Sequence, residues 1–251
     1  TDPEVRASRA SPIQSSSSPF TTEAWFDLLE RTCFNGLPGK PLDITVENGC
    51  GSQLRLRHQP AWWDGTIAGL SNFYTPLLAP TGSPDQWPEV AVELVRRLRQ
   101  CKGWTELRLQ PLEQDAIWIT RLSEELRQAG FKHDRYFCFG NWYATVSGEV
   151  GQAFLERTLP SQLRNTISRA EQRLMRRGAL EIEVRADGFD EETLTSCIAD
   201  FQSVYGHSWK RSEPFPEFIP ELFRVGARLG WLRFGCLRLN GKPIASQIWL
   251  T

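Results

Sequence analysis

The sequence has no apolar run that approaches the roughly 18 residues needed to span a membrane, so no membrane-crossing helix is expected. A secretory signal peptide is absent as well. Methionine is almost missing, since Met175 is the only one and the chain begins with Thr1. We therefore expect the N-terminus to be that of a fragment or of a processed product.

Spacings typical of metal sites and of disulfide frameworks are also missing. The cysteines are scattered, and no Cys-x-x-Cys or Cys/His ligand pattern occurs. A chain of 251 residues can bury a core without disulfide bonds. We therefore expect no metal site, reduced and mostly buried thiols, and a cytoplasmic protein. The six cysteines are Cys33, Cys50, Cys101, Cys138, Cys197 and Cys236.

Charge of one sign is not in excess. The 29 Lys and Arg residues balance 30 Asp and Glu residues, for a formal net charge of −1. The molecule as a whole therefore has no field that would attract nucleic acid or an anionic surface. Nucleic acid is not expected as a partner.

Aromatic residues, in contrast, are plentiful, with 10 Trp and 14 Phe. Large rings bury much area each, so they supply sizeable cores or an aromatic binding groove. The length allows two domains. We expect a disordered serine-rich tail over residues 1–19, an N-terminal half over 20–147 and a C-terminal half over 148–251.

Strand and helix patterns alternate in both halves, which predicts α/β architecture with mixed sheets flanked by helices. The first half shows a hairpin over 42–46 and 53–57 around Asn48-Gly49, helices over 84–101 and 117–128, a strand over 105–109, and a long strand or hairpin over 131–146. The second half shows helices over 150–157, 161–177 and 190–205, a strand over 179–185, and a further helix that ends at Gly230.

A second hairpin is predicted at the C-terminal end, from strands 231–239 and 243–250. Strand 179–185 is expected to flank strand 231–239. Apolar residues occur at both parities of 231–239, so we expect this strand to be covered on both faces. The far edge of 243–250 is expected to be open, or to pair with another copy of the chain.

Several segments carry a family resemblance. They are residues 159–166 with the arginine-rich helix that follows, 230–233, 241–250, and 72–77 in the first half. These segments are similar to the bacterial tandem-GNAT branch of the GNAT acyltransferase superfamily, a branch that includes CelD-like and Fem-like proteins. The order of strand, two helices and hairpin over 179–250 also resembles the opening of the GNAT fold.

The resemblance implies a tandem GNAT-like fold and an enzyme that moves an acyl group, with acetyl expected first, from acyl-CoA to an amine or hydroxyl. GNAT folds hold the donor on a splayed strand and a glycine-rich turn at a helix N-terminus. The nearest match to that turn, at 238–243, is a hairpin turn instead. We therefore expect the C-terminal half to stop before the acyl-CoA-binding strand and loop, and this chain alone to be inactive and to bind acetyl-CoA weakly or not at all.

The resemblance and the pattern together suggest acceptor-site residues but no catalytic residue. Trp209 and Lys210 lie between two helices, where GNAT folds shape the acceptor pocket, and His207 beside them is a weaker candidate for a general base. An aromatic or basic loop residue can equally cap the edge of a core. The predicted substrate-binding residues are Trp209, Lys210, Gln247, Asn72, Tyr74 and Arg164.

Arg169, Arg173, Arg176 and Arg177 fall on one side of the helix over 161–177, next to an apolar stripe. Two interpretations stay open: an anion-binding face, or a solvated face whose cations favour the C-terminal end of the helix dipole.

Two other functions also stay open. The first is a non-catalytic interaction module that has the GNAT shape. The second is a Fem-like transferase that takes its donor from aminoacyl-tRNA, although no helical coiled-coil insertion is visible. For an acyltransferase, the acceptor would be a small molecule, a saccharide or a cell-envelope precursor, and oligomers could form through the open sheet edge.

Overall fold

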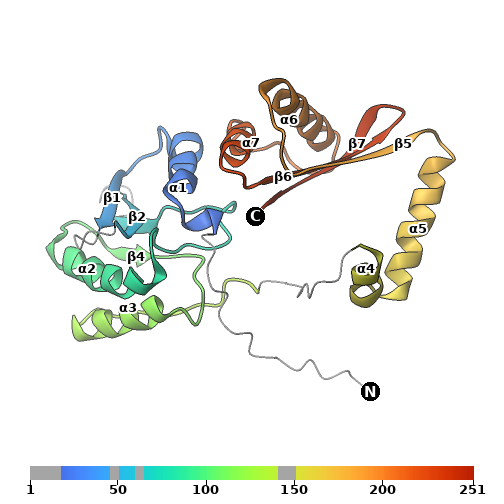
Figure 1. Ribbon diagram of the computed structural model, residues 1–251. Coiled ribbons are helices and arrows are strands. Elements are labelled where there is room, and N and C mark those ends of the chain that lie inside the picture. Colours follow the sequence, from blue (N-terminus) through green and yellow to red (C-terminus); the bar gives the residue numbers. More distant parts are fainter. Residues whose placement is uncertain (1–17, 46–50, 60–64, 141–150) are drawn as a thin grey trace, which may run out of the picture. The chain divides into compact units, whose positions relative to one another are not determined.

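The computed structural model describes residues 18–45, 51–59, 65–140 and 151–251 (Figure 1). The chain divides into two compact units. One comprises Thr1–Phe26 and Gly39–Glu125, and the other comprises Asp27–Pro38 and Leu126–Thr251. Most of the predicted tail, the turn at Asn48-Gly49 and the predicted boundary at 147 lie outside the described residues. No helix in the described part is long and apolar enough to cross a membrane.

The first unit contains a mixed sheet, as predicted. Its order is β1-β2-β3-β4, with β1 antiparallel to β2, β2 antiparallel to β3, and β3 parallel to β4. The strands are β1 (Lys40–Thr45), β2 (Gln53–His58), β3 (Thr66–Gly69) and β4 (Glu106–Arg108). The hairpin and the strand near 105–109 are thereby confirmed.

Helices of the first unit follow the apolar periodicity of the sequence. The element α2 buries Val90, Ala91, Leu94, Val95 and Leu98 on one face, and it packs on the sheet at β1. Helix α3 matches its predicted range, and Gly130 follows it with φ 81°. The helical elements are η1 (Pro19–Thr21), α1 (Glu23–Leu29), η3 (Pro84–Gln86), α2 (Trp87–Gln100) and α3 (Ile117–Gln128).

The strand or hairpin predicted over 131–146 is wrong where it can be checked. Residues 131–140 have no regular secondary structure, and 141–146 lie outside the described residues. Tyr136 and Phe137 are each 86% exposed. Alternating aromatics favour a strand only when a neighbouring strand and a covering layer are available, and neither is present for these ten residues.

The second unit contains a three-stranded sheet of order β5-β6-β7. Its strands are β5 (Leu180–Arg185), β6 (Leu232–Leu239) and β7 (Lys242–Leu250). β6 pairs antiparallel with both neighbours, which confirms the predicted hairpin and the flanking position of β5. This sheet is antiparallel throughout its described strands, so the expectation of a second mixed sheet is not met.

Two helices with predicted ranges supply the core of the second unit. Asp190 caps α6 by accepting a hydrogen bond from the Thr193 backbone N–H at 2.8 Å. Gly230, with φ 75°, follows the end of α7 as predicted. The helical elements are η2 (Glu30–Phe34), α4 (Gln152–Thr158), α5 (Ser161–Met175), α6 (Glu191–Gly206) and α7 (Phe218–Arg228).

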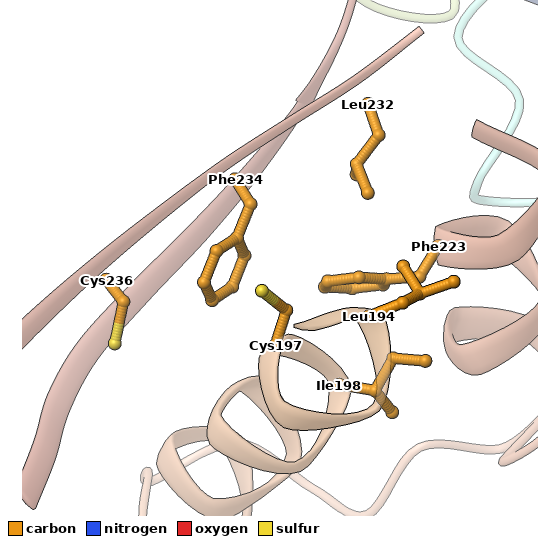
Figure 2. Close-up of a cluster of buried hydrophobic side chains, with 7 residues drawn as sticks. All are labelled: Leu194, Cys197, Ile198, Phe223, Leu232, Phe234 and Cys236. Carbon is orange, nitrogen blue, oxygen red and sulfur yellow. The ribbon is translucent and has the colours of Figure 1, made fainter. Parts of the chain in front are cut away.

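The core lies between these two helices and one face of the sheet (Figure 2). Phe223 of α7 stands between Phe201 of α6 and Phe234 of β6, with ring centroids 5.7 and 5.8 Å apart in edge-on geometry. The cluster fixes α6 and α7 on the sheet and so holds the ends of the segment between them. Its fully buried members are Leu194, Cys197, Ile198, Phe223, Leu232, Phe234 and Cys236.

The other face of this sheet is open, which corrects the prediction that β6 is covered on both faces. Residues directly opposite each other share a face, so Ile182, Val184, Leu237 and Trp249 lie together, away from the core side. Ile182 is 70% exposed, Val184 72% and Trp249 47%. The parity pattern predicts where side chains point, but not what packs against them.

The turn between β6 and β7 is tied to the start of β5. Asn240 has φ 51° and Gly241 φ 74°, the left-handed pair that a two-residue hairpin turn requires. The Asn240 Oδ1 accepts a hydrogen bond from the Ala179 N–H at 2.9 Å, and its own N–H donates to the Ala179 carbonyl at 2.8 Å. The side chain of Asn240 leaves no room for a Cβ at Gly178, whose φ is 156°.

The thiols are free wherever they are described, as predicted. They are Cys33, Cys101, Cys138, Cys197 and Cys236. Cys50 lies outside the described residues.

Candidate functional site

The connection between α6 and α7, residues 207–217, is the candidate site of the second unit. Helix α6 ends at Gly206, and the Tyr205 hydroxyl donates a hydrogen bond to the Arg211 carbonyl at 3.1 Å. The Ser208 hydroxyl donates to the Tyr205 carbonyl at 2.7 Å. These bonds turn the chain away from the helix axis, and Pro214 then prevents the helix from resuming.

Trp209 and Lys210 project from this turn. Trp209 is 93% exposed, which is unusual for the largest apolar side chain. The Lys210 ammonium lies 5.6 Å from the centroid of the Tyr205 ring, within the range of a cation–π contact. The structure therefore brings two predicted residues together with Tyr205 as an aromatic and cationic surface. The alternative that Trp209 caps a core edge is not supported by its exposure.

His207 has one ring nitrogen fixed. Its Nδ1 lies 2.7 Å from the Ser203 carbonyl oxygen, which can only accept a hydrogen bond. Nδ1 therefore carries the proton, and Nε2 of the neutral ring is left as an acceptor. An exposed imidazole with this tautomer can take a proton from a bound amine or hydroxyl.

Glu213 is a candidate proton acceptor that sequence reasoning missed. Its Oε1 is buried without a hydrogen-bond partner among the described residues. Burial raises the pKa of this carboxyl above its ordinary value. An upward pKa shift caused by burial is the direction in which proteins tune carboxyl groups for general acid–base catalysis. The segment around Glu213 has no apolar periodicity. The only signal in the sequence is its position in a polar loop, directly before Pro214.

A second polar cluster lies where α6 crosses β5 and β6. The Arg238 guanidinium of β6 hydrogen-bonds to Asp200 of α6, and to Glu183 of β5 at 3.3 Å. The bond to Asp200 is the main cause that raises the pKa of Arg238. Arg185 pairs with Glu183 at 2.9 Å. Cations and anions alternate in this cluster and neutralise one another. Because Arg238 contacts both Asp200 and Glu183, the cluster joins α6 to the sheet.

This cluster borders a pocket of about 240 Å³ whose lining includes Cys197. Burial raises the pKa of the Cys197 thiol to about 11. The thiol therefore stays protonated at neutral pH and is a poor nucleophile. The pocket has no feature that points to covalent chemistry.

The other predicted residues do not join the α6–α7 connection. Gln247 is exposed and sits opposite Gly235, on the sheet face that turns away from α6 and α7. The Trp249 ring lies over Gly235, where an added Cβ would come within 3.1 Å of it. Arg164 lies half-buried on α5, which packs chiefly against α4.

Asn72 and Tyr74 belong to the first unit, in the segment that follows β3. The Asn72 Oδ1 accepts a hydrogen bond from the Tyr74 N–H at 3.0 Å, and its Nδ2 is buried with no hydrogen-bond partner in the described part of the chain. Ser71 donates to the Gln110 carbonyl at 2.5 Å, just beyond β4. The segment thus lies at the carboxyl ends of the parallel strands β3 and β4, the end of an α/β sheet where ligands commonly bind.

Comparison with known families gives one result. Residues 161–251 match the family model described as an acetyltransferase (GNAT) domain. The match covers α5, β5, α6, α7 and the hairpin, and supports acyl transfer as the general chemistry. No curated protein and no solved structure matches the chain.

Proposed function

We propose that the second unit takes part in transfer of an acyl group from acyl-CoA to an amine or hydroxyl, and that the α6–α7 connection binds the acceptor. The acceptor is a small molecule, a saccharide or a cell-envelope precursor. The main support is the GNAT match over residues 161–251, combined with an exposed aromatic and cationic surface in the connection. Membership of the bacterial tandem-GNAT branch is part of the same proposal, whereas a Fem-like transferase that uses aminoacyl-tRNA is the alternative to it.

The described residues of the second unit fit the acceptor better than the donor. A donor site of the GNAT kind needs a splayed strand pair and a glycine-rich turn at a helix N-terminus. The described strands of this unit are all antiparallel, and Asn240-Gly241 is a hairpin turn. These residues therefore have no proposed role at the donor, and we propose that residues 1–251 alone bind acetyl-CoA weakly or not at all.

On the acceptor side, the chemistry required of the protein is positioning and removal of one proton. Trp209 offers a flat apolar surface for stacking, and Lys210 offers a cation for an acidic or hydroxyl group of the acceptor. The Nε2 of His207 or the carboxylate of Glu213 would accept the proton that the nucleophile loses. The donor supplies the thioester, whose carbonyl carbon forms the new bond while the thiol leaves.

The experiment measures thiol release from acetyl-CoA with a panel of amine and hydroxyl acceptors. Two samples are compared: the protein expressed from its natural gene, and residues 1–251 alone. Trp209→Ala should raise KM for the acceptor on the order of tenfold, with a smaller change in kcat, because stacking contributes chiefly to binding. Phe137→Ala, which removes an equally exposed aromatic side chain outside both candidate binding segments, is the control.

Acceptor-dependent thiol release that is impaired in Trp209→Ala and intact in Phe137→Ala supports the proposal. Absence of release with every acceptor from the natural protein would overturn it in favour of a non-catalytic module. Transfer that requires aminoacyl-tRNA in place of acetyl-CoA would favour the Fem-like alternative. Micromolar binding of acetyl-CoA by residues 1–251 would show that the donor site lies within them.

A further inference from the structure

The helix α5 carries a concentrated positive charge on one side. Arg169 and Arg173 on this helix, and Arg176 and Arg177 in the turn directly after its last residue Met175, are all exposed. At about 100° per residue, Arg169 and Arg173 lie roughly 40° apart on the helix surface, and the other two arginines continue this charge past its end. None of the four forms an ion pair within the described part of the chain. Their charge is therefore available to an external partner.

The apolar stripe of the same helix lies next to these arginines. Leu163 is 45% exposed and Ile167 is 50% exposed, while Ala170 and Leu174 are half-buried. No residue of α5 is fully buried. An amphipathic helix of a folded domain normally buries this stripe. Here the stripe and the arginines are presented to solvent side by side.

The charge of this segment contrasts with that of the rest of the chain. Residues 161–177 hold five arginines and one glutamate, a net charge of +4, while the whole chain has −1. The other residues together therefore carry −5. The net charge of the whole molecule cannot attract an anionic partner. The positive charge of residues 161–177 can, at distances within a Debye length of ~10 Å.

We infer that α5 is a docking helix for an anionic phospholipid surface. Its leucine and isoleucine side chains would enter the boundary between headgroups and acyl chains, while the arginines contact lipid phosphates. Each arginine near an anionic leaflet strengthens binding about fivefold. The helix carries polar residues on its remaining side, such as Asn165, Ser168 and Gln172, and so lies in the surface without spanning the bilayer.

The observations favour a lipid surface over other anionic partners. A nucleic acid would engage the arginines and leave Leu163 and Ile167 in water, since helical contacts to phosphates need no apolar stripe. Hot spots of protein–protein interfaces are enriched in Trp and Tyr, and α5 contains neither. A lipid surface accepts aliphatic side chains and arginines together without specific geometry.

The test is sedimentation of the purified chain with vesicles of phosphatidylcholine alone, or of phosphatidylcholine mixed with an equal amount of phosphatidylglycerol. The chain should bind the mixed vesicles, with affinity that falls as salt rises. Arg169→Gln, Arg173→Gln and Arg177→Gln combined should weaken this binding on the order of a hundredfold. Arg99→Gln, Arg127→Gln and Arg228→Gln combined remove the same charge from exposed positions on other helices. That control should retain most of the binding.

A second variant, Leu163→Gln with Ile167→Gln, keeps every charge and removes the apolar stripe. It should weaken vesicle binding by about tenfold or more, with unchanged helical content and thermal midpoint. Equal binding by the wild type and both α5 variants would overturn the inference, as would equal binding to both kinds of vesicle. So would a marked fall in the thermal midpoint of the stripe variant, which would show that the chain itself covers the stripe. Binding to a DNA duplex that depends on the arginines but not on the stripe, without vesicle binding, would assign the face to nucleic acid instead.

Discussion

Gly178 occupies a position where both its backbone angle and the space around it require glycine. A Cβ there would lie 2.1 Å from the Asn240 Oδ1, an atom engaged in a hydrogen bond to Ala179. Gly178→Ala should therefore lower the free energy of unfolding by about 1–3 kcal/mol, as measured by chemical denaturation. Gly206→Ala, where no atom lies within 4 Å of the added Cβ, should be neutral or slightly stabilising.

The double variant Gly178→Ala with Asn240→Ala separates the two causes. If crowding by Asn240 dominates, the free energy of unfolding should fall less in the double variant than the sum of its falls in the two single variants. Strict additivity, or a Gly178→Ala protein as stable as the wild type, would contradict the close approach described here.

Glu213 should make stability depend on pH. Burial raises the pKa of its carboxyl in the folded protein. At a pH below the ordinary glutamate pKa of about 4.3, both folded and unfolded states are protonated and no cost arises. As pH rises through the raised folded pKa, the folded state loses stability, because ionisation is easier in the unfolded chain. The penalty is complete above the folded pKa.

Glu213→Gln should remove this penalty. The variant should gain stability relative to the wild type between pH 4 and pH 7, by less than about 1 kcal/mol because the group is only partly buried. Urea denaturation at the two pH values measures the difference, and Glu171→Gln, at an exposed carboxylate, should show none. A loss of relative stability at pH 7 would mean that the Glu213 carboxylate has a stabilising partner.

Among the elements, β7 has an outer edge without a strand partner in the described part of the chain. Its unpaired N–H and C=O groups can pair with another copy. We expect concentration-dependent self-association in sedimentation velocity. Ala245→Lys, at an exposed site on this strand, should weaken it by roughly 1 kcal/mol, since like charges oppose each other across a symmetric strand pair.

Ser168→Lys adds the same charge on a helix and should leave self-association unchanged. A wild-type chain that stays monomeric at all concentrations would show that strand pairing between copies does not occur.

The accuracy of the sequence predictions varied with the kind of signal available for each element. The amphipathic pattern over 190–205 located α6 within one residue, because apolar periodicity is a local signal. The turn Asn240-Gly241 located the hairpin for the same reason. Residues 131–140 were wrongly predicted because their alternation depends on a neighbouring strand, and a single sequence does not show whether one is available.

For the candidate site, the position of Trp209 and Lys210 in a helix–helix connection followed from the sequence. The contact between Lys210 and Tyr205 could also have been anticipated, because the two residues are only five positions apart and the chain turns between them. The orphaned oxygen of Glu213 and the fixed tautomer of His207 could not, because both depend on which backbone groups lie nearby.

At the scale of the whole molecule, the sequence correctly predicts α/β architecture but not the asymmetry of the second sheet. Phe234 and Ile182 are both apolar strand residues, yet the first is fully buried and the second is 70% exposed. The alternation within each strand does not show which face of the sheet is covered. What distinguishes them is the packing of α6 and α7 on one face only, which depends on the path of the chain after β5.

The central position of β6 also determines the order in which this sheet can assemble. A two-residue turn joins β6 to β7, whereas residues 186–231 separate β6 from β5. The entropic cost of closure grows with the length of the loop, so the hairpin forms its contacts at much lower cost than β5 does. Short hairpins close in about 1–10 μs, whereas β5 must await the collapse of α6 and α7 between the strands. The hydrogen bonds of Asn240 to Ala179 therefore form late, as the step that brings the sheet to its full width.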